Sequence, residues 1–178
     1  MVEAFQLIHT PNILFGPGKI KELPNQTGKY GNNILLIHGS GSFMQSEKGQ
    51  EITASLDDGG LKVSKAGVTH EPSPALVDGI VQENVRNNID AVVAIGGGSV
   101  LDTGKAVSAM LPLNKPVREY LEKVGSRKPT GEKLPFIAIP TTSGTGSEAT
   151  SNAVISEVGE EGFKNPCGIT IMCPILLC

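Results

Sequence analysis

The sequence predicts an α/β fold, with a mostly parallel sheet, helices on both faces and a C-terminal β-hairpin. Short apolar runs typical of buried strands alternate with segments of helical periodicity along the 178 residues. This alternation requires crossovers between parallel strands. Three loops of glycines and hydroxyl residues each follow directly after an apolar run. The pattern is Rossmann-like. Because ligands bind at the carboxyl ends of the strands in such sheets, it predicts a site along one sheet edge.

The first half of the chain contains three predicted strands and two predicted helices. A mixed apolar segment ends in Phe15-Gly16-Pro17-Gly18, which is typical of a strand followed by a turn. One helix stops at Gly59-Gly60, which suits a C-cap, and the next begins at Ser73-Pro74, which suits the N-cap and the first helical position. The strands are expected at residues 5–15, 34–37 and 61–66, and the helices at 43–56 and 73–88.

The stretch 90–110 passes from strand to turn to helix, and the rest of the prediction is organised around it. Residues 91–95 form an uninterrupted apolar run, as in a parallel strand covered on both faces. The triplet Gly96-Gly97-Gly98 follows, and its lack of Cβ atoms lets a ligand approach the backbone. From Ser99 on, apolar residues recur on one helical face. The first amides of that helix are unsatisfied and lie at the positive end of its dipole, so the junction predicts a phosphate site.

The second half adds one strand, a second polar loop and the hairpin. Residues 112–133 are rich in proline and charge, with a short helix expected around 117–123. The strand 136–139 continues into a loop of glycines and hydroxyl residues that ends at Thr150. Two further segments, 152–156 and 168–172, are separated by an acidic glycine-containing turn and are expected to form the hairpin.

Two named phosphate-binding motifs come close to the glycine triplet, and both fail. A Walker A loop needs glycine where Ser99 stands and a hydroxyl where Ala106 stands, and the dinucleotide fingerprint has Leu101 in place of its last glycine. What remains is Gly-Gly-Gly-Ser-x-x-Asp-x-x-Lys, with Asp102 and Lys105 on one helical face. The alternative without a ligand is an ordinary helix start with a surface ion pair, and a second loop that is only a polar turn with capping hydroxyls.

Composition narrows the classes of partner. A net charge of -3 with scattered Lys and Arg predicts no nucleic-acid partner and no membrane-surface partner. No run approaches the roughly 20 apolar residues of a membrane span, and the first residues lack the pattern of a signal peptide. We therefore expect a single domain over residues 1–178, located in the cytoplasm. The three cysteines are expected to be free thiols. His9, His38 and His70 lack metal-ligand spacing and are expected to have packing or surface roles.

The chain resembles the iron-dependent (group III) alcohol dehydrogenases through two spaced motifs. One is Gly96-Gly97-Gly98-Ser99-x-x-Asp102-x-x-Lys105, and the other is Pro140-Thr141-Thr142-Ser143-Gly144-Thr145-Gly146-Ser147-Glu148. The Phe15 to Gly18 turn also matches, as does the Glu71-Pro72-Ser73 turn, although Glu71 replaces the Asn of the family. The resemblance extends from about Phe5 to Lys164. It covers only the nucleotide-binding domain of a family that also has an all-helical, metal-holding domain.

The resemblance implies that the cofactor is NAD(P), with its pyrophosphate on the glycine turn. Asp102 would lie near the nicotinamide and is the candidate catalytic residue. Gly39 stands where the family often has an Asp that repels a 2′-phosphate, which implies that NADP is accepted at least as well as NAD. The candidate cofactor-binding residues are Gly39, Ser40, Gly96, Gly97, Gly98, Ser99, Asp102, Thr141, Thr142, Thr145, Thr150 and Lys164.

Two functions follow from this resemblance. The first is that of a truncated iron-type alcohol dehydrogenase, an NAD(P)-dependent oxidoreductase that interconverts small alcohols and aldehydes or ketones by hydride transfer. Such enzymes hold a divalent metal, Fe or Zn, through one Asp and three His. That motif is absent here, so no metal ligand is predicted within the chain. The alternative is a non-catalytic NAD(P)-binding module left by truncation.

The apolar tail, residues 165–178, is expected to be an interface segment. Several of its side chains would lack full cover within the chain, and burying each is worth roughly 1.5–3 kcal/mol. They are Ile169, Ile171, Met172, Ile175, Leu176 and Leu177. The predicted strand 168–172 would also present an edge that a two-fold related copy could extend. We therefore expect a homodimer or homotetramer joined through the C-terminal strands.

Overall fold

The computed structural model describes residues 11–39, 43–122, 124–157, 163–167 and 175–177. Its main sheet has six parallel strands in the order β1-β8-β5-β4-β2-β3, and β6 and β7 form a separate antiparallel pair. The strands are β1 (Asn12–Leu14), β2 (Asn33–Gly39), β3 (Lys62–Val68), β4 (Ala91–Gly96), β5 (Phe136–Pro140), β6 (Ala153–Glu157), β7 (Phe163–Cys167) and β8 (Ile175–Leu177). The helices are η1 (Lys19–Glu22), α1 (Leu23–Gly28), α2 (Glu47–Asp58), α3 (Pro74–Asn84), α4 (Gly98–Leu113) and η2 (Val117–Tyr120). The predicted Rossmann-like α/β class is confirmed.

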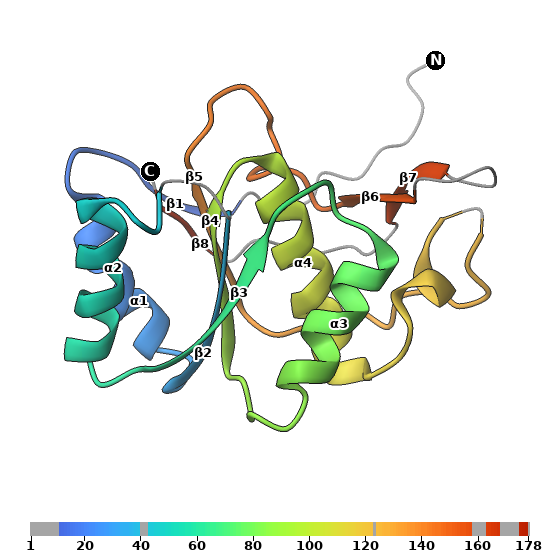
Figure 1. Cartoon of the computed structure of the whole chain (residues 1–178), viewed down its shortest axis with the longest axis horizontal. Helices are drawn as coiled ribbons and strands as arrows, with labels where there is room; N and C mark the ends of the chain where they lie inside the picture. Colours follow the sequence, from blue (N-terminus) through green and yellow to red (C-terminus); the bar gives the residue numbers. More distant parts are fainter. Residues whose placement is uncertain (1–10, 40–42, 123, 158–162, 168–174, 178) are drawn as a thin grey trace, which may run out of the picture.

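Helices cover both faces of the sheet, with α1 and α2 on one side and α3 and α4 on the other (Figure 1). The apolar run of β2 explains how one strand serves both layers. Leu35 and Ile37 pack in the core on the side of α3 and α4, whereas Ile34 and Leu36 pack with α1 and α2. Because successive side chains point to opposite faces of a strand, a continuous apolar run is what a strand buried on both faces requires.

Helix α4 is buried along nearly its whole length, from Val100 to Leu111. It contacts the sheet, α3 and β6, so it has no face that is mostly solvated. Gly104 allows this approach. A Cβ on Gly104 would lie 2.7 Å from the Cβ of Ala94 and 2.7 Å from a ring carbon of Phe136. Close packing of α4 on β4 and β5 therefore fixes where the N-terminus of α4 lies.

The predicted strands and helices of the central region match the observed ones, and two short helical elements were missed. The sequence pattern predicted no helix between residues 19 and 28, where η1 and α1 lie. Helix α1 has six residues, with a proline in its first turn. A helix this short spans fewer than two turns and cannot display a repeating apolar pattern. The first strand occupies Asn12–Leu14 only, and residues 5–10 lie outside the described part.

The C-terminal segments differ from the prediction in two ways. The partner of β6 in the hairpin is β7, at Phe163–Cys167, and not the expected segment 168–172, which lies outside the described residues. Residues Ile175–Leu177 form β8, whose backbone pairs with β1 on one side and with β5 on the other. These three residues lie inside the main sheet and not at an open edge. Assembly of copies of the chain through the C-terminal strands stays a prediction. Hydrophobicity alone could not distinguish a strand that completes its own sheet from one that awaits a partner.

In the described part of the chain, no helix is both long and apolar enough to cross a membrane.

Candidate functional site

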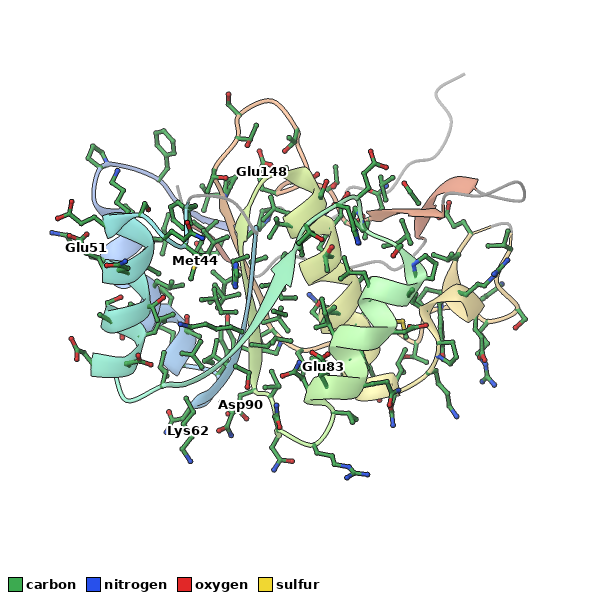
Figure 2. All side chains as sticks on the ribbon, in the orientation of Figure 1. Met44, Glu51, Lys62, Glu83, Asp90 and Glu148 are labelled. Atoms are coloured by element: carbon green, nitrogen blue, oxygen red, sulfur yellow. The ribbon has the colours of Figure 1, made fainter. Side chains whose placement is uncertain are left out.

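The two polar loops predicted as a ligand site lie at one end of the sheet. Ile95 and Gly96 of β4 are in register with Ile139 and Pro140 of β5, so the two strands end side by side. The loop that follows β5 then arches over the N-terminal end of α4 (Figure 1). Its first residue is tied there, because the Thr141 amide donates a 3.0 Å hydrogen bond to the carbonyl of Gly96. In Figure 2, Glu148 of this loop lies at the upper end of the central strands, and Asp90, just before β4, lies at their lower end.

The N-terminus of α4 offers free backbone donors. Gly97 is the N-cap, with extended backbone (φ -78, ψ -174) and no capping side chain. The amides of Val100 and Leu101 both donate to the Gly97 carbonyl, at 3.0 and 3.1 Å. The preceding amides, those of Gly98 and Ser99, come too early in the helix to find a carbonyl one turn back. Together with the positive end of the helix dipole, these donors suit a phosphate group.

The loop after β5 lies close to the start of α4, where two residues lack side chains. A Cβ on Gly97 would lie 3.3 Å from the Thr142 hydroxyl, and one on Gly98 would lie 3.2 Å from the Ser147 hydroxyl. Thr145 is also within 3.5 Å of that second position. The structure thus brings the predicted residues Gly97, Gly98, Thr142 and Thr145 together, and the hydroxyls of Thr142 and Ser147 lie near the helix start.

Gly96 has a different local role from its two neighbours. It is buried at the end of β4, and a Cβ there would lie 2.5 Å from Val100. Packing of the strand against the first turn of α4 therefore already requires glycine at this position. The sequence alone could not distinguish a glycine required by packing from one required by ligand binding, because the residue is glycine in both cases.

A pocket of about 240 Å³ opens beside the start of α4. Three segments line it: the first turn of α4, the strand β6 and the turn before α3. The lining residues are Glu71, Pro72, Gly98, Ser99, Asp102, Val154 and Ser156. Sequence reasoning singled out the α4 residues and missed Val154 and Ser156. No local signal could have found them, because β6 reaches α4 only through tertiary packing.

Asp102 and Lys105 form a buried ion pair. The Lys105 Nζ lies 3.0 Å from Asp102 Oδ1, and the exposed fractions of the two side chains are 0% and 9%. The second carboxylate oxygen of Asp102 accepts a hydrogen bond of 3.2 Å from the Val154 amide. The alternative that these residues form a surface ion pair is therefore wrong. The catalytic role of Asp102 stays a prediction, and both of its oxygens are engaged within the chain.

The remaining predicted residues lie in other parts of the chain than the glycine triplet. Thr150 contacts the buried Lys105, because its hydroxyl accepts a hydrogen bond from Lys105 Nζ at 3.0 Å. Gly39 ends β2, and a Cβ on it would meet Val100 at 3.7 Å, an ordinary contact. Lys164 lies in β7, in register with Ser156 of β6. Ser40 lies outside the described residues.

The described residues do not form a metal site. Among them, no three His, Cys, Asp or Glu side chains gather closely enough to hold a metal ion. The ring Nδ1 of His38 lies 2.9 Å from the Gly39 carbonyl, and that of His70 lies 3.1 Å from the Glu71 carbonyl. His9 lies outside the described residues. The donors present in this part of the chain thus do not fit a divalent metal, and no chemical step is assigned to one.

The fold and the loops at the carboxyl edge place the chain among the Rossmann-like α/β proteins. A model of the family described as "Iron-containing alcohol dehydrogenase" matches residues 10–177. The chain therefore belongs to the iron-containing alcohol dehydrogenase family. The resemblance inferred from the glycine triplet and the Pro140 to Glu148 loop is confirmed.

Similar proteins include dehydrogenases of bacterial origin. The chain is 32% identical over 156 residues to a probable NADH-dependent butanol dehydrogenase of Bacillus subtilis, covering 87% of this chain and 40% of that protein. It is 34% identical over 154 residues to an NAD-dependent methanol dehydrogenase of Bacillus methanolicus, covering 83% and 38%. The chain thus spans about 40% of the length of the curated relatives it matches.

Solved structures show the same arrangement. An iron-containing alcohol dehydrogenase from Thermotoga maritima aligns with a TM-score of 0.82 at 26% identity, over 98% of this chain and 47% of the other. A sulfoacetaldehyde reductase from Bifidobacterium kashiwanohense, solved in complex with NAD+, aligns with a TM-score of 0.81 at 25% identity, over 99% and 46%.

Proposed function

We propose that the chain binds NAD(P) with the pyrophosphate on the amides of Gly98 and Ser99 and serves an alcohol dehydrogenase reaction. The observation that carries the proposal is the uncapped N-terminus of α4 beneath a loop of hydroxyl residues. The helix dipole and the unsatisfied amides supply attraction for an anion without any basic side chain. The threonines of the loop, Thr141, Thr142 and Thr145, supply hydroxyls for ribose and base.

The bound cofactor would accept or deliver a hydride at its nicotinamide, interconverting a small alcohol and an aldehyde or ketone. The pocket beside the α4 N-terminus suits one end of an extended dinucleotide, because it adjoins the phosphate donors directly. The exposed surface of its walls is mainly apolar, so it suits the face of a ring at the cofactor end placed there, with Glu71 and Asp102 among the lining residues. The role of this chain would be to bind and orient the cofactor and to exclude water from one side of it.

A second candidate function is nucleotide binding without turnover. The observation that favours it is the lack of any metal-suited group of side chains among the described residues. The two functions differ in a simple way. The first requires that hydride transfer accompany binding, and the second requires binding alone.

Titration with NADH, followed by fluorescence, tests the binding that both functions share. Gly98→Val should abolish binding, because the new side chain would occupy the space between the α4 amides and Ser147. Gly28→Val is the matched control, since a Cβ on Gly28 at the end of α1 meets nothing within 4 Å. Equal affinity of the wild-type protein and Gly98→Val, with circular dichroism unchanged, would contradict the proposed phosphate site.

Hydride transfer separates the two candidates. NADH consumption with short-chain aldehydes, measured with and without added Fe²⁺ or Zn²⁺, should proceed if this chain supports the reaction. Binding of NADH with no consumption under either condition would favour the non-catalytic module.

A further inference from the structure

We propose that Lys105 is a positioning residue for this site: with Asp102 it takes the place of a neighbouring strand and holds β6 against α4. The Lys105 ammonium donates three hydrogen bonds to three different segments. Its acceptors are Asp102 Oδ1 at 3.0 Å, the Thr150 hydroxyl at 3.0 Å and the Asn152 carbonyl at 2.7 Å. This proposal rests on the proposed function in one respect: it takes NADH as the ligand of the site that Lys105 positions.

The edge of β6 that faces α4 is satisfied by groups that do not belong to a strand. Backbone groups of alternate residues point to the same side of a strand, and here they belong to Asn152, Val154 and Ser156. The Asn152 carbonyl accepts from Lys105, the Val154 amide donates to Asp102 Oδ2 at 3.2 Å, and the Ser156 amide donates to the Pro72 carbonyl at 2.7 Å. The opposite edge of β6 pairs with β7. Two side chains and one carbonyl thus complete the pairing that a further strand would otherwise supply.

Burial makes this arrangement specific. The Lys105 side chain is 0% exposed and is among the largest of the fully buried side chains in the described part of the chain. An ammonium has three hydrogens, and each has an acceptor here. A buried charge with all its partners is tolerated, but one that loses a partner is costly, so β6 is held in one position relative to α4.

One ammonium therefore joins two of the three segments that line the pocket, α4 and β6, to the loop above the phosphate donors. Strand β6 supplies Val154 and Ser156 to the pocket, and α4 supplies Gly98 and Ser99. Thr150 ends the loop that passes over Gly97 and Gly98. Because Lys105 is fully buried, it cannot touch a ligand. Any effect of its removal on NADH affinity must act through the position of these elements.

The test measures β6 directly and NADH binding separately, in the full chain. Lys105→Met should speed hydrogen exchange at the Val154 and Ser156 amides in the absence of ligand, and weaken NADH binding. If β6 is held in place only a tenth of the time, NADH affinity falls about tenfold. Protection at these amides is then almost entirely lost, because they are open for most of the time. The double variant Asp102→Asn with Lys105→Met leaves no unpaired buried carboxylate. It should also speed hydrogen exchange at these amides and weaken NADH binding. Lys19→Met is the matched control, because Lys19 and Glu22 form an exposed ion pair with the same three-residue spacing.

Each outcome decides something. Unchanged exchange at Val154 and Ser156 in a folded Lys105 variant overturns the proposal, whatever the affinity does. Faster exchange in a protein whose wild-type form fails to bind NADH supports the positioning role and contradicts the proposed function. If neither variant folds, hydrogen exchange at the Val154 and Ser156 amides of the wild-type protein tests the proposal. Exchange there should be slow and should slow further with NADH, since a ligand that needs β6 in place must also stabilise it. Rapid exchange at these amides in the wild-type protein contradicts the proposal.

Discussion

The carboxylate of Asp78 in α3 accepts a hydrogen bond of 2.8 Å from the backbone amide of Val117, the first residue of η2. This bond ties the connection that leaves α4 back onto α3. Partial burial of the carboxyl group raises its pKa above the ordinary value of 3.8, and the hydrogen bond from Val117 opposes that rise.

The raised pKa of Asp78 predicts the sign of a pH effect on stability. A carboxyl group whose pKa is higher in the folded state contributes stability below its unfolded pKa and loses it as pH rises through the folded pKa. Asp78→Asn keeps an oxygen that can accept from Val117 and removes the titration. The free energy of unfolding of this variant, relative to wild type, should therefore increase as pH rises from about 3.8 and then level off. Urea denaturation at several pH values measures it, and a difference that is constant with pH would contradict the prediction.

Removal of the Asp78 side chain beyond Cβ should be destabilising. Asp78→Ala leaves the Val117 amide without its acceptor, which costs about 1–3 kcal/mol when the group stays buried. The midpoint of urea denaturation at neutral pH should fall for Asp78→Ala and not for Asp78→Asn. Equal midpoints would show that water replaces the carboxylate freely.

Gly104 should tolerate no side chain. In Gly104→Ala the new Cβ would lie 2.7 Å from both Ala94 and Phe136, and such overpacking costs about 1–3 kcal/mol. Helix propensity alone would favour Ala by about 1 kcal/mol, so a net loss of stability would show that the steric clash outweighs helix propensity. Gly79→Ala is the control: Gly79 lies inside α3, where a Cβ meets nothing within 4 Å, and this variant should become more stable. Thermal denaturation of the two variants should shift in opposite directions.

Gly39 should govern the choice between NADP and NAD. We expect the wild-type protein to bind NADPH at least as well as NADH, because no carboxylate stands at the end of β2. Gly39→Asp introduces one where a Cβ makes only an ordinary contact with Val100. Repulsion of a 2′-phosphate should then weaken NADPH binding by about tenfold or more and leave NADH binding unchanged or improved. Parallel fluorescence titrations measure this. A clear NADH preference in the wild-type protein would contradict it.

Deletion of residues 175–178 should destabilise the individual chain. Strand β8 lies between β1 and β5, so its loss leaves β5 with a new edge and separates β1 from the sheet. The melting temperature should fall, and light scattering should show aggregation. A deletion variant with unchanged stability and a smaller oligomer would instead favour the expectation of assembly through the C-terminal strands.

The sequence by itself determined the central strands and the start of α4. The predicted strands at 34–37, 61–66, 91–95 and 136–139 overlap the observed β2, β3, β4 and β5. The conformation of these elements is determined locally, because a run of apolar residues, or three glycines before a helical pattern, is recognisable from residues that are neighbours along the chain. For the same reason the candidate phosphate donors at Gly98 and Ser99 could be named from the motif.

Only the tertiary structure decided which groups meet across long stretches of chain. Lys105 and Asn152 are far apart in sequence, and nothing near either residue predicts that the ammonium is fully buried and serves as a partner for β6. The same holds for β8, whose apolar residues look identical whether they complete their own sheet or await another chain. Burial and pairing are properties of the packed chain, because they depend on which distant backbone groups need partners once the core has closed.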